Sequence, residues 1–451
     1  MTRNRFSRRE FIGLGAAAAG ASLGLKTILL DPDPLWALPQ TVAPSDRVRF
    51  GMIGIGMQGS GLLANSIELP GVQCVAACDL YDGRHTLAKE IVGPNLPTTR
   101  RYHELLENKE IDCIVAAVPD HWHKQVVVDA VSAGKDIYIE KPMSHTGAEG
   151  VEMVAAAQKN GRIVQVGSQR VSSVICAKAK ELVAQGVLGD LMLVEGSLGR
   201  NDPTGAWEYP PPTDLSPQTL DWDTWQGTVP KRDFDPLIFA RWRCWKEYGT
   251  GVAGDLMVHL ISGMLFTLGL NEAPRRVTAL GGIRRFNDGR NMPDVHMSLY
   301  EYKNMPVYIR LNLGSASPEV LRFYGSQGIL ELSENGLSFG SQPGVDLGPS
   351  YYAGSFPENL RGAYEKSWHA EHDPKPGEEP LYDGVNYVGD SYDDTRPHLW
   401  KYFQAVKSRQ PVVQDVVFGH HAAIACHMAN ESYFRGRAVV FDPATDTLKT
   451  E

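Results

Sequence analysis

The sequence lacks the features that mark several specialised classes of protein. Its six cysteines form no CxxC pair, so neither a disulfide scaffold nor a cysteine-rich zinc site is indicated, and buried free thiols are expected. The hydrophobic share of 43% and charged share of 22% are ordinary for globular chains, which excludes disordered, collagen-like and coiled-coil proteins. A net charge of −9 argues against a nucleic-acid partner. The chain has 451 residues, which is long enough for two or three domains with a substantial core.

Residues 1–43 are predicted to be an export signal and linker rather than part of a folded domain. Residues 7–12 read Ser-Arg-Arg-Glu-Phe-Ile, and a mildly apolar run rich in Gly and Ala follows. This pattern resembles a twin-arginine (Tat) export signal, which a receptor reads. Lys26 interrupts the apolar run, which suits export better than a membrane span, with an uncleaved membrane anchor as the alternative. We therefore expect a periplasmic or otherwise exported protein.

The rest of the chain is predicted to form two α/β domains. In residues 44–167, short apolar runs alternate with helical segments, which is typical of βαβ units and a doubly wound parallel sheet. In residues 168–451, successive strand-like runs joined by short loops indicate a mostly antiparallel sheet. Helices are expected at 254–268, 398–408 and 419–435, whereas residues 340–395 look like long loops.

A glycine-rich turn predicts dinucleotide binding in the first domain. Gly54-Ile55-Gly56-Met57-Gln58-Gly59 fits GxGxxG, and it follows an apolar strand and opens a helix. Glycines there let the backbone approach a pyrophosphate at a helix N-terminus. Asp79 stands twenty residues after Gly59, at the end of the second strand. A carboxylate in that position accepts from a ribose 2′-hydroxyl and repels a 2′-phosphate, so NAD is favoured over NADP.

Two further segments are expected to face the same cofactor. Pro119 to His123 closes the third strand, and Glu140-Lys141-Pro142 closes a later one. Ligands of open parallel sheets bind at the carboxyl ends of the strands. By itself, Lys141 has the simpler interpretation of a solvated surface lysine.

With these motifs in order, the chain resembles the Gfo/Idh/MocA family, which includes glucose–fructose oxidoreductase and inositol dehydrogenase. The glycine-rich turn, Pro119 to His123, Glu140-Lys141-Pro142 and the later segment from Asp255 to His259 occur in the family's order and at similar spacing. The resemblance implies a Rossmann domain followed by an α/β domain with a large open sheet. It also implies a catalytic trio of Lys141, Asp255 and His259.

The chemistry of these three residues agrees with that role. Asp255 and His259 are four apart on a predicted helix and therefore share one face. A lysine beside a positive nicotinamide loses its proton more easily and could take a hydroxyl proton as hydride leaves carbon. His259 is the second candidate for that proton, with Asp255 orienting it. An ordinary helix pair is the alternative for Asp255 and His259, and the choice of base stays open.

Other residues are assigned from the resemblance alone. Gln169 is placed at the cofactor, and Arg170, Trp242 and Arg243 are placed at the substrate, together with His259. The many tryptophans before Gly249 suit either a sugar-binding pocket or plain core packing. No metal site is predicted, because His369-Ala-Glu371-His372 falls in a predicted loop and lacks the helical context of HExxH.

Export of a nicotinamide enzyme suggests a cofactor that is loaded before export, bound tightly and regenerated in place. One scheme oxidises one sugar or polyol and reduces another. A second is redox-neutral: transient oxidation permits elimination, as in the NAD-dependent glycosidases of glycosyl hydrolase family 109. Those glycosidases share the export signal and a Trp-x-His segment, but they do not usually carry Glu-Lys-Pro or an acidic residue four before the histidine. We therefore favour the oxidoreductase over the glycosidase. A homo-oligomer (dimer or tetramer) is also expected, because the exposed face of the open sheet needs to be covered. A non-catalytic sugar-binding protein is the third reading, disfavoured because Lys141 and His259 are both present.

Overall fold

The computed structural model describes residues 26–30, 42–303, 305–334, 336–342, 349, 351–373, 384–389 and 394–451. The predicted twin-arginine motif lies outside the described residues, as does most of the predicted linker. The six cysteines are all buried and unpaired, as expected.

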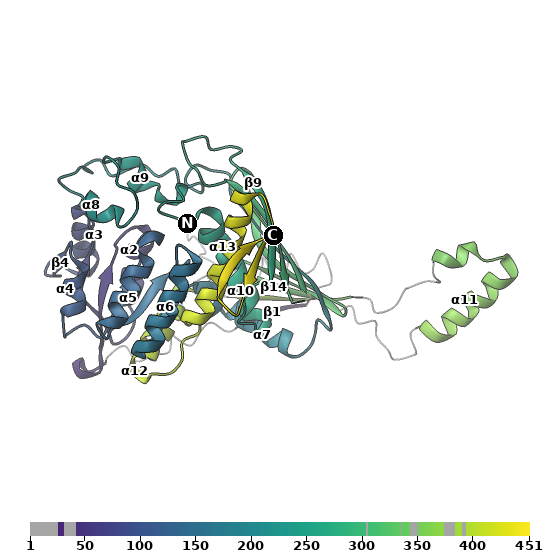
Figure 1. Ribbon diagram of the computed structural model, residues 1–451. Coiled ribbons are helices and arrows are strands. Elements are labelled where there is room, and N and C mark those ends of the chain that lie inside the picture. Colours follow the sequence, from purple (N-terminus) through teal and green to yellow (C-terminus); the bar gives the residue numbers. More distant parts are fainter. Residues whose placement is uncertain are drawn as a thin grey trace, which may run out of the picture.

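The first domain is a doubly wound parallel sheet with helices on both faces (Figure 1). Its six strands run in the order β4-β3-β2-β5-β6-β7. Because both faces are covered, the central strands are nearly continuous apolar runs rather than alternating ones. The strands are β2 (Val48–Ile53), β3 (Val72–Cys78), β4 (Thr98–Thr99), β5 (Cys113–Ala116), β6 (Asp136–Glu140) and β7 (Val164–Gly167). The helices are α2 (Met57–Ile67), α3 (Asp82–Val92), α4 (Tyr102–Glu107), α5 (His123–Ser132) and α6 (Gly147–Asn160).

The second sheet has eleven strands in the order β1-β15-β14-β13-β12-β8-β11-β10-β9-β16-β17. It is mostly antiparallel; β8 with β11 and β1 with β15 are parallel pairs. The predicted fold class, a Rossmann sheet followed by a large, mostly antiparallel sheet, is therefore confirmed. The strands are β1 (Lys26–Leu30), β8 (Leu191–Gly199), β9 (Arg276–Gly282), β10 (Val295–Tyr302), β11 (Met305–Asn312), β12 (Ser317–Gly325), β13 (Gly328–Ser333), β14 (Gly336–Ser341), β15 (Val385–Gly389), β16 (Val439–Asp442) and β17 (Thr447–Thr450).

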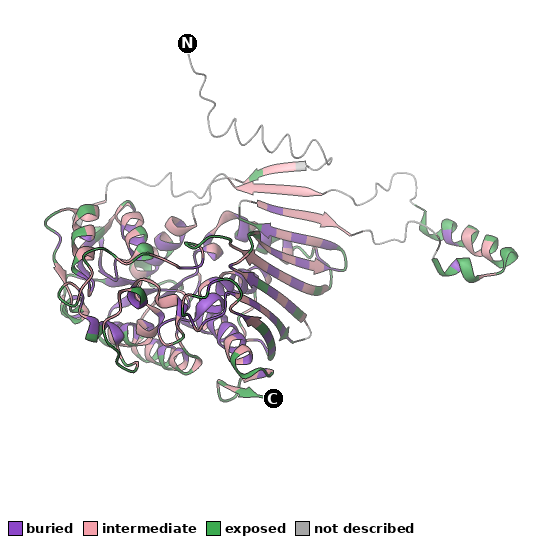
Figure 2. Ribbon diagram, turned by 90° about the horizontal axis from the view of Figure 1, so that it is seen from above, coloured by how far each residue is buried: buried purple, intermediate pink, exposed green. Residues whose placement is uncertain are grey.

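One face of this sheet packs against α7 (Val174–Ala184), α10 (Val258–Leu268) and α13 (Val416–Arg435). Buried and exposed residues alternate along strands such as β9 and β10, as expected for a sheet covered on one face only (Figure 2). α10 is preceded directly by a π-helical turn, η6 (Ala253–Met257). This turn carries Asp255 into the space between the two sheets.

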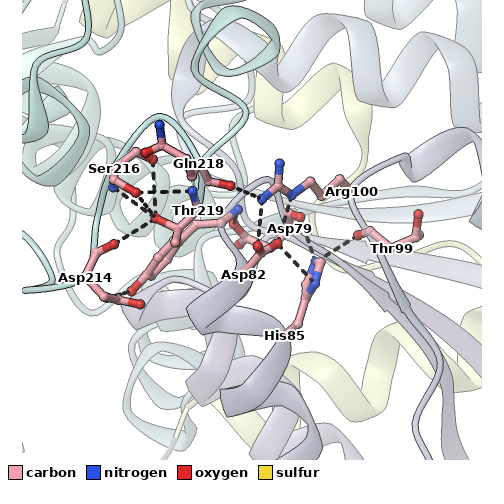
Figure 3. A network of polar contacts seen from close by, with 10 residues as sticks. Asp79, Asp82, His85, Thr99, Arg100, Asp214, Ser216, Gln218 and Thr219 are labelled. Atoms are coloured by element: carbon pink, nitrogen blue, oxygen red, sulfur yellow. Dashed lines mark hydrogen bonds and ion pairs between the residues drawn. The ribbon is translucent and has the colours of Figure 1, made fainter.

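The stretch after β8 returns to the first domain. It contains α8 (Trp222–Gln226), α9 (Pro236–Ala240) and η5 (Trp242–Cys244), and its aromatic side chains pack on Tyr81. A polar network holds it at the end of β3 (Figure 3). Arg100 donates to both carboxylate oxygens of Asp82, at 2.8 and 2.7 Å, and to the carbonyl oxygen of Gln218 at 3.1 Å. The hydroxyl of Tyr81 donates to Asp214.

Three segments differ from the sequence-based expectation. Residues 26–30, assigned to the linker, form β1 at the edge of the second sheet, because the unpaired backbone of β15 accepts another strand there. α12 (Thr395–Ser408), assigned to the second domain, packs against the Rossmann strands through Leu399, Tyr402 and Phe403. Within the predicted loop 340–395, residues Glu358–His372 form the helix α11.

Candidate functional site

A cleft between the two sheets contains most of the predicted site residues. Its volume is about 1650 Å³, part of which is open solvent at its mouth, and residues of both domains line it. Its lining includes Gly56 to Gly59 of the glycine-rich turn as well as Lys141, Asp255 and His259. The catalytic and cofactor-binding residues predicted from distant parts of the sequence therefore meet in one place.

The glycine-rich turn fits a bound pyrophosphate. Gly54 has a φ of +83°, and a Cβ on it would lie 2.4 Å from the carbonyl oxygen of Ala117. A Cβ on Gly59 would lie 2.0 Å from the carbonyl oxygen of Gly54, so the close packing of α2 on β2 requires glycine. Gly56 is the N-cap of α2 and supplies no side-chain cap, which leaves the first helical amides available to an anion.

Asp79 is buried at the end of β3, with 6% of its surface exposed. Its carboxylate accepts from the backbone N–H of Ile55 at 2.8 Å and of Tyr81 at 3.0 Å. The guanidinium of Arg84 lies 3.3 Å from the same carboxylate and 4.9 Å from the centre of the Phe239 ring. Asp79 therefore also fixes the loop around the cofactor site, and Arg84 is a cation beside it that sequence reasoning did not single out.

Glu140 organises the middle of the cleft without being exposed. It accepts hydrogen bonds from the side-chain amides of Gln58 at 3.1 Å and Gln169 at 2.6 Å, and from the hydroxyl of Tyr138 at 3.2 Å. Burial raises its pKa, while the neighbouring Lys141 and these donors act in the opposite direction. The two glutamines, one on each side of the cofactor site, are thus held by one carboxyl group.

Lys141 and Asp255 form the central ion pair. The Lys141 ammonium donates to the carbonyl oxygen of Asp255 at 2.6 Å and to its carboxylate at 3.0 Å. Nε of Arg243 donates to the same carboxylate oxygen at 3.0 Å. Burial alone would raise the pKa of Asp255, but the two cations lower it well below its ordinary value. The carboxylate is therefore ionised and bound to two cations.

His259 lies four residues after Asp255, in the first turn of α10. Neither of its ring nitrogens has a hydrogen-bond partner among the described residues, and Nδ1 is fully buried. Burial lowers its pKa well below the ordinary value, and the charges of Lys141 and Arg170 act in the same direction. The expected orientation of His259 by Asp255 is absent, because the carboxylate is bound to Lys141 and Arg243 instead.

The predicted substrate residues Arg170, Trp242 and Arg243 also line the cleft. Arg170 pairs with Glu319 at 2.9 Å, and the guanidinium of Arg243 lies 4.2 Å from the centre of the Trp242 ring. Sequence reasoning missed several other lining residues: Arg84, Arg200, Trp207, Tyr209, Trp225, Phe239 and Glu319. For the five of these between 200 and 248 the only signal was the density of aromatic and basic residues in that stretch, and Arg84 and Glu319 gave none.

His123 is the predicted cofactor residue that the structure places elsewhere. It is buried, and its ring nitrogens lie 2.7 Å from the carbonyl oxygen of Pro142 and 3.0 Å from that of Val118. His123 therefore ties the end of β5 to the loop that carries Lys141, and it is not among the residues that line the cleft. The first residue of a helix at this edge of the sheet can point into the protein rather than toward a ligand. Spacing along the chain does not reveal which of the two occurs.

The described residues hold no group of three or more His, Cys, Asp or Glu side chains placed to bind a metal ion. His369 and His372 lie on the helix α11, not in a loop as expected from the sequence. None of the described helices has both the length and the apolar character required to cross a bilayer.

The first domain matches a known family. Residues 48–168 match GFO_IDH_MocA, described as the oxidoreductase family with an NAD-binding Rossmann fold. This part of the chain is therefore similar to the NAD-binding Rossmann domain of that oxidoreductase family.

Individual relatives share part of the chain. Inositol 2-dehydrogenase of Salmonella paratyphi B is 32% identical over 153 residues, which cover 33% of this chain and 45% of that enzyme. Glycosyl hydrolase family 109 protein 1 of Bacteroides fragilis is 29% identical over 207 residues, 42% of this chain and 45% of that protein. The chain thus matches less than half the length of these curated relatives.

The fold extends over almost the whole chain. A levoglucosan dehydrogenase, solved with NADH and levoglucosan, superposes with a TM-score of 0.59 and 18% sequence identity over 90% of this chain and 99% of that one. The superposition shows a shared two-sheet fold, and 18% identity carries the likeness no further than the fold.

Proposed function

We propose that the protein is an NAD-dependent oxidoreductase that transfers hydride between a secondary alcohol of a sugar or polyol and a tightly bound nicotinamide cofactor. The observation that carries the proposal is that Lys141, Asp255 and His259 line the same cleft as the glycine-rich turn. The similarity to inositol 2-dehydrogenase and the fold shared with levoglucosan dehydrogenase support this class of substrate.

The cofactor's part is limited to one event: when bound, the nicotinamide ring accepts or returns the hydride. The residues that would hold it are the amides at the start of α2, the buried carboxylate of Asp79 and the two glutamines that Glu140 holds. The carboxylate of Asp79 would favour NAD, whereas the Arg84 cation 3.3 Å from it would suit a 2′-phosphate.

Lys141 and His259 divide the handling of the proton. Two N–H groups of the Lys141 ammonium are held by Asp255, which leaves the third to donate to the oxygen of the reacting alcohol. His259 is neutral and its nitrogens lack partners in the described structure, so it is the group that takes the hydroxyl proton as the hydride leaves carbon. Asp255 acts by holding Lys141 and Arg243 in place.

The aromatic stretch after β8 supports retention of the cofactor. Trp225 and Thr224 face a second, apolar hollow that also borders Gly54, Asp79 and Pro119, next to the main cleft. Arg100, which Asp82 holds in place, donates to the carbonyl oxygen of Gln218 and so ties this stretch to the Rossmann domain (Figure 3). A fixed cover suits a cofactor that stays bound between turnovers, as export to the periplasm would require.

The test uses natively purified full-length protein. Denaturation is expected to release NAD or NADH, and addition of a sugar or polyol to the native protein is expected to change the absorbance at 340 nm. Lys141→Ala is expected to keep the dinucleotide and lose that change, whereas a mere sugar-binding protein would be indifferent to it. Protein that contains no dinucleotide and does not take it up would contradict the proposal.

A redox-neutral glycosidase is the second candidate, and the similarity to glycosyl hydrolase family 109 favours it. Transient oxidation at one carbon would acidify a neighbouring C–H. Loss of that proton would expel the aglycone, which takes up a proton, water would add to the resulting double bond, and the hydride would then return to the oxidised carbon. Incubation with a panel of nitrophenyl glycosides separates the two functions. Release of nitrophenol with no net change at 340 nm would replace the oxidoreductase by the glycosidase.

We also propose that the open face of the second sheet is a self-association surface. Leu280 and Leu299, on neighbouring strands, are 69% and 59% exposed, and Met192 on β8 is 52% exposed. Apolar residues on an uncovered sheet face are typical of an interface. Leu280→Asp with Leu299→Asp is expected to convert a dimer or tetramer into monomer in sedimentation velocity, and a wild-type monomer would contradict the proposal.

A further inference from the structure

The turn that follows β8 forms one wall of the cleft at its substrate end. Arg200, Trp207 and Tyr209 all line the cleft there, together with His259. The turn is closed internally, because the carboxylate of Asp202 accepts from the backbone N–H of Gly205 at 2.6 Å. Nη1 of Arg200 donates to the carbonyl oxygen of Gly205 at 3.1 Å. One of the guanidinium's five N–H donors is thus used to hold the group, and the others are available to a ligand.

Trp207 is held in a strained backbone conformation within this turn. Its φ is +64°, a left-handed value that bulky residues rarely adopt, and its side chain is almost fully buried. The preceding carbonyl, of Ala206, accepts from Arg290 at 2.9 Å, and Asp288 in turn holds Arg290 at 2.7 Å. Strain that the surroundings maintain in this way is characteristic of ligand-binding sites. It fixes the buried indole in the wall of the cleft, within the turn that carries Arg200.

Arg200 differs from the other cations at this end of the cleft. Lys141 and Arg243 share the carboxylate of Asp255, and Arg170 pairs with Glu319. Within the part of the chain that the structure describes, Arg200 has no carboxylate at ion-pair distance, although its charge acts electrostatically on His259. It also acts on Tyr209 and Glu319, so it stands within reach of the groups that surround the substrate. A partly buried guanidinium without a carboxylate partner leaves an anion-binding position in the protein.

We propose that Arg200 binds the carboxylate of an acidic sugar, so that uronic or aldonic acids are the substrates, and that the buried Trp207 anchors the turn that presents this arginine. The inference rests on the proposed oxidoreductase function and adds the substrate class to it. A single planar guanidinium matches the two oxygens of a carboxylate through parallel N–H donors. A phosphate would call for further donors, and the neighbouring cations of this cleft are already engaged with carboxylates.

The experiment compares substrates that differ in one group. Full-length protein with its native cofactor is mixed with glucose, glucuronate or glucose 6-phosphate, and with galactose or galacturonate, while the nicotinamide absorbance is followed. Binding of each sugar is measured in parallel by calorimetry, which does not depend on turnover. The variants are Arg200→Gln, which removes the charge, and Arg200→Lys, which keeps the charge but not the planar fork. Arg47→Gln, at an exposed arginine outside the cleft, is the control.

The wild-type protein is expected to prefer the uronate to the matching neutral sugar in kcat/KM, and Arg200→Gln is expected to lower that preference about 10- to 100-fold. Arg200→Lys should restore it in part, and Arg47→Gln should leave it unchanged. Equal use of the neutral sugar, a preference that Arg200→Gln does not alter, or a preference for the 6-phosphate would each overturn the inference while leaving the oxidoreductase function intact. If no sugar alters the nicotinamide signal, the proposed function fails, and calorimetry decides the anion site separately. Uronate binding that Arg200→Gln abolishes supports the site, and absence of uronate binding refutes it.

Discussion

The ammonium of Lys141 is 2.6 Å from the carbonyl oxygen of Asp255 and 3.0 Å from its carboxylate, although the two residues are 114 positions apart in the chain. The pair joins the end of β6 in the Rossmann domain to the π-helical turn before α10 in the second domain. The Asp255 carboxylate also accepts from Arg243, so it positions both Lys141 and a residue of the proposed substrate pocket.

Asp255→Asn should therefore separate positioning from cofactor binding. The change leaves two cations without a buried counter-charge, which costs about 3 kcal/mol of stability and at least about 100-fold in kcat. The dinucleotide should stay bound, because Asp255 does not touch the glycine-rich turn. Asp442→Asn removes a carboxylate paired with Lys449 at the protein surface and is the control. A variant with normal kcat would remove Asp255 from the proposed mechanism.

Oxidation of the sugar should be insensitive to pH between about 6 and 8. The pKa of His259 is lowered well below 6.5 by burial, so the imidazole is neutral and able to take a proton across that range. An ordinary histidine would lose half of its neutral form near pH 6.5. The single-turnover rate of absorbance change at 340 nm measures this in the stopped flow. A midpoint near 6.5 that disappears in His259→Gln would show that His259 titrates normally.

Acidification should destabilise the fold through His398. Burial lowers the pKa of this residue to about 4, against about 6.5 in the unfolded chain. Above pH 6.5 both states are neutral; as the pH falls below that value the unfolded chain takes up the proton first, so stability is lost toward pH 4. The loss from this group amounts to about 2 kcal/mol at pH 5. Urea unfolding at pH 7.5 and 5.0 measures it, and His398→Gln should show a smaller difference. An equal difference in both proteins would contradict the assignment.

The glycines of α2 offer a matched pair of substitutions. Gly59→Ala places a Cβ 2.0 Å from the carbonyl oxygen of Gly54 and should abolish dinucleotide binding or prevent folding. Gly61→Ala, two residues on, meets nothing within 4 Å and should stabilise the helix by up to about 1 kcal/mol. Dinucleotide content after purification and the urea midpoint give the comparison. Gly59→Ala protein with full NAD content would refute the role of this contact.

The network at the end of β3 should slow release of the cofactor. Arg100→Ala removes the bonds to Asp82 and Gln218 that hold the aromatic stretch, and the release rate of NAD should rise about 2- to 10-fold. Arg101→Ala removes an exposed neighbour paired with Glu104 and should have no effect. Release is followed by transfer of NAD to an excess of a coupled dehydrogenase. Equal release rates in the two variants would show that the stretch does not retain the cofactor.

The sequence predicted those features that depend on local pattern. The alternation of strands and helices predicts a parallel sheet, and a glycine-rich turn between an apolar strand and a helix predicts dinucleotide binding, so the Rossmann fold and the place of this turn in it followed from the sequence. The residues at the ends of those strands, Lys141 among them, follow from the same rule, because the carboxyl ends of parallel strands meet at one edge of the sheet.

Contacts between segments distant in the chain were beyond that reasoning. Nothing in the residues around His123 indicated that its ring would point at Pro142 rather than into the cleft, and the pairing of residues 26–30 with β15 depends on an edge strand more than 350 residues later. The return of α12 to the Rossmann domain likewise depends on a surface that other segments create.

The sequence by itself therefore determined the two sheets, the dinucleotide turn and the residue types available for acid–base chemistry, because periodicity and backbone freedom are local properties. Only the tertiary structure decided that Asp255 binds Lys141 and Arg243 instead of His259, and that Arg200 stands in the cleft without a carboxylate partner among the described residues. The physical reason is that charges and hydrogen bonds depend on distance and burial, which the packing of two domains creates and which no spacing along the chain encodes.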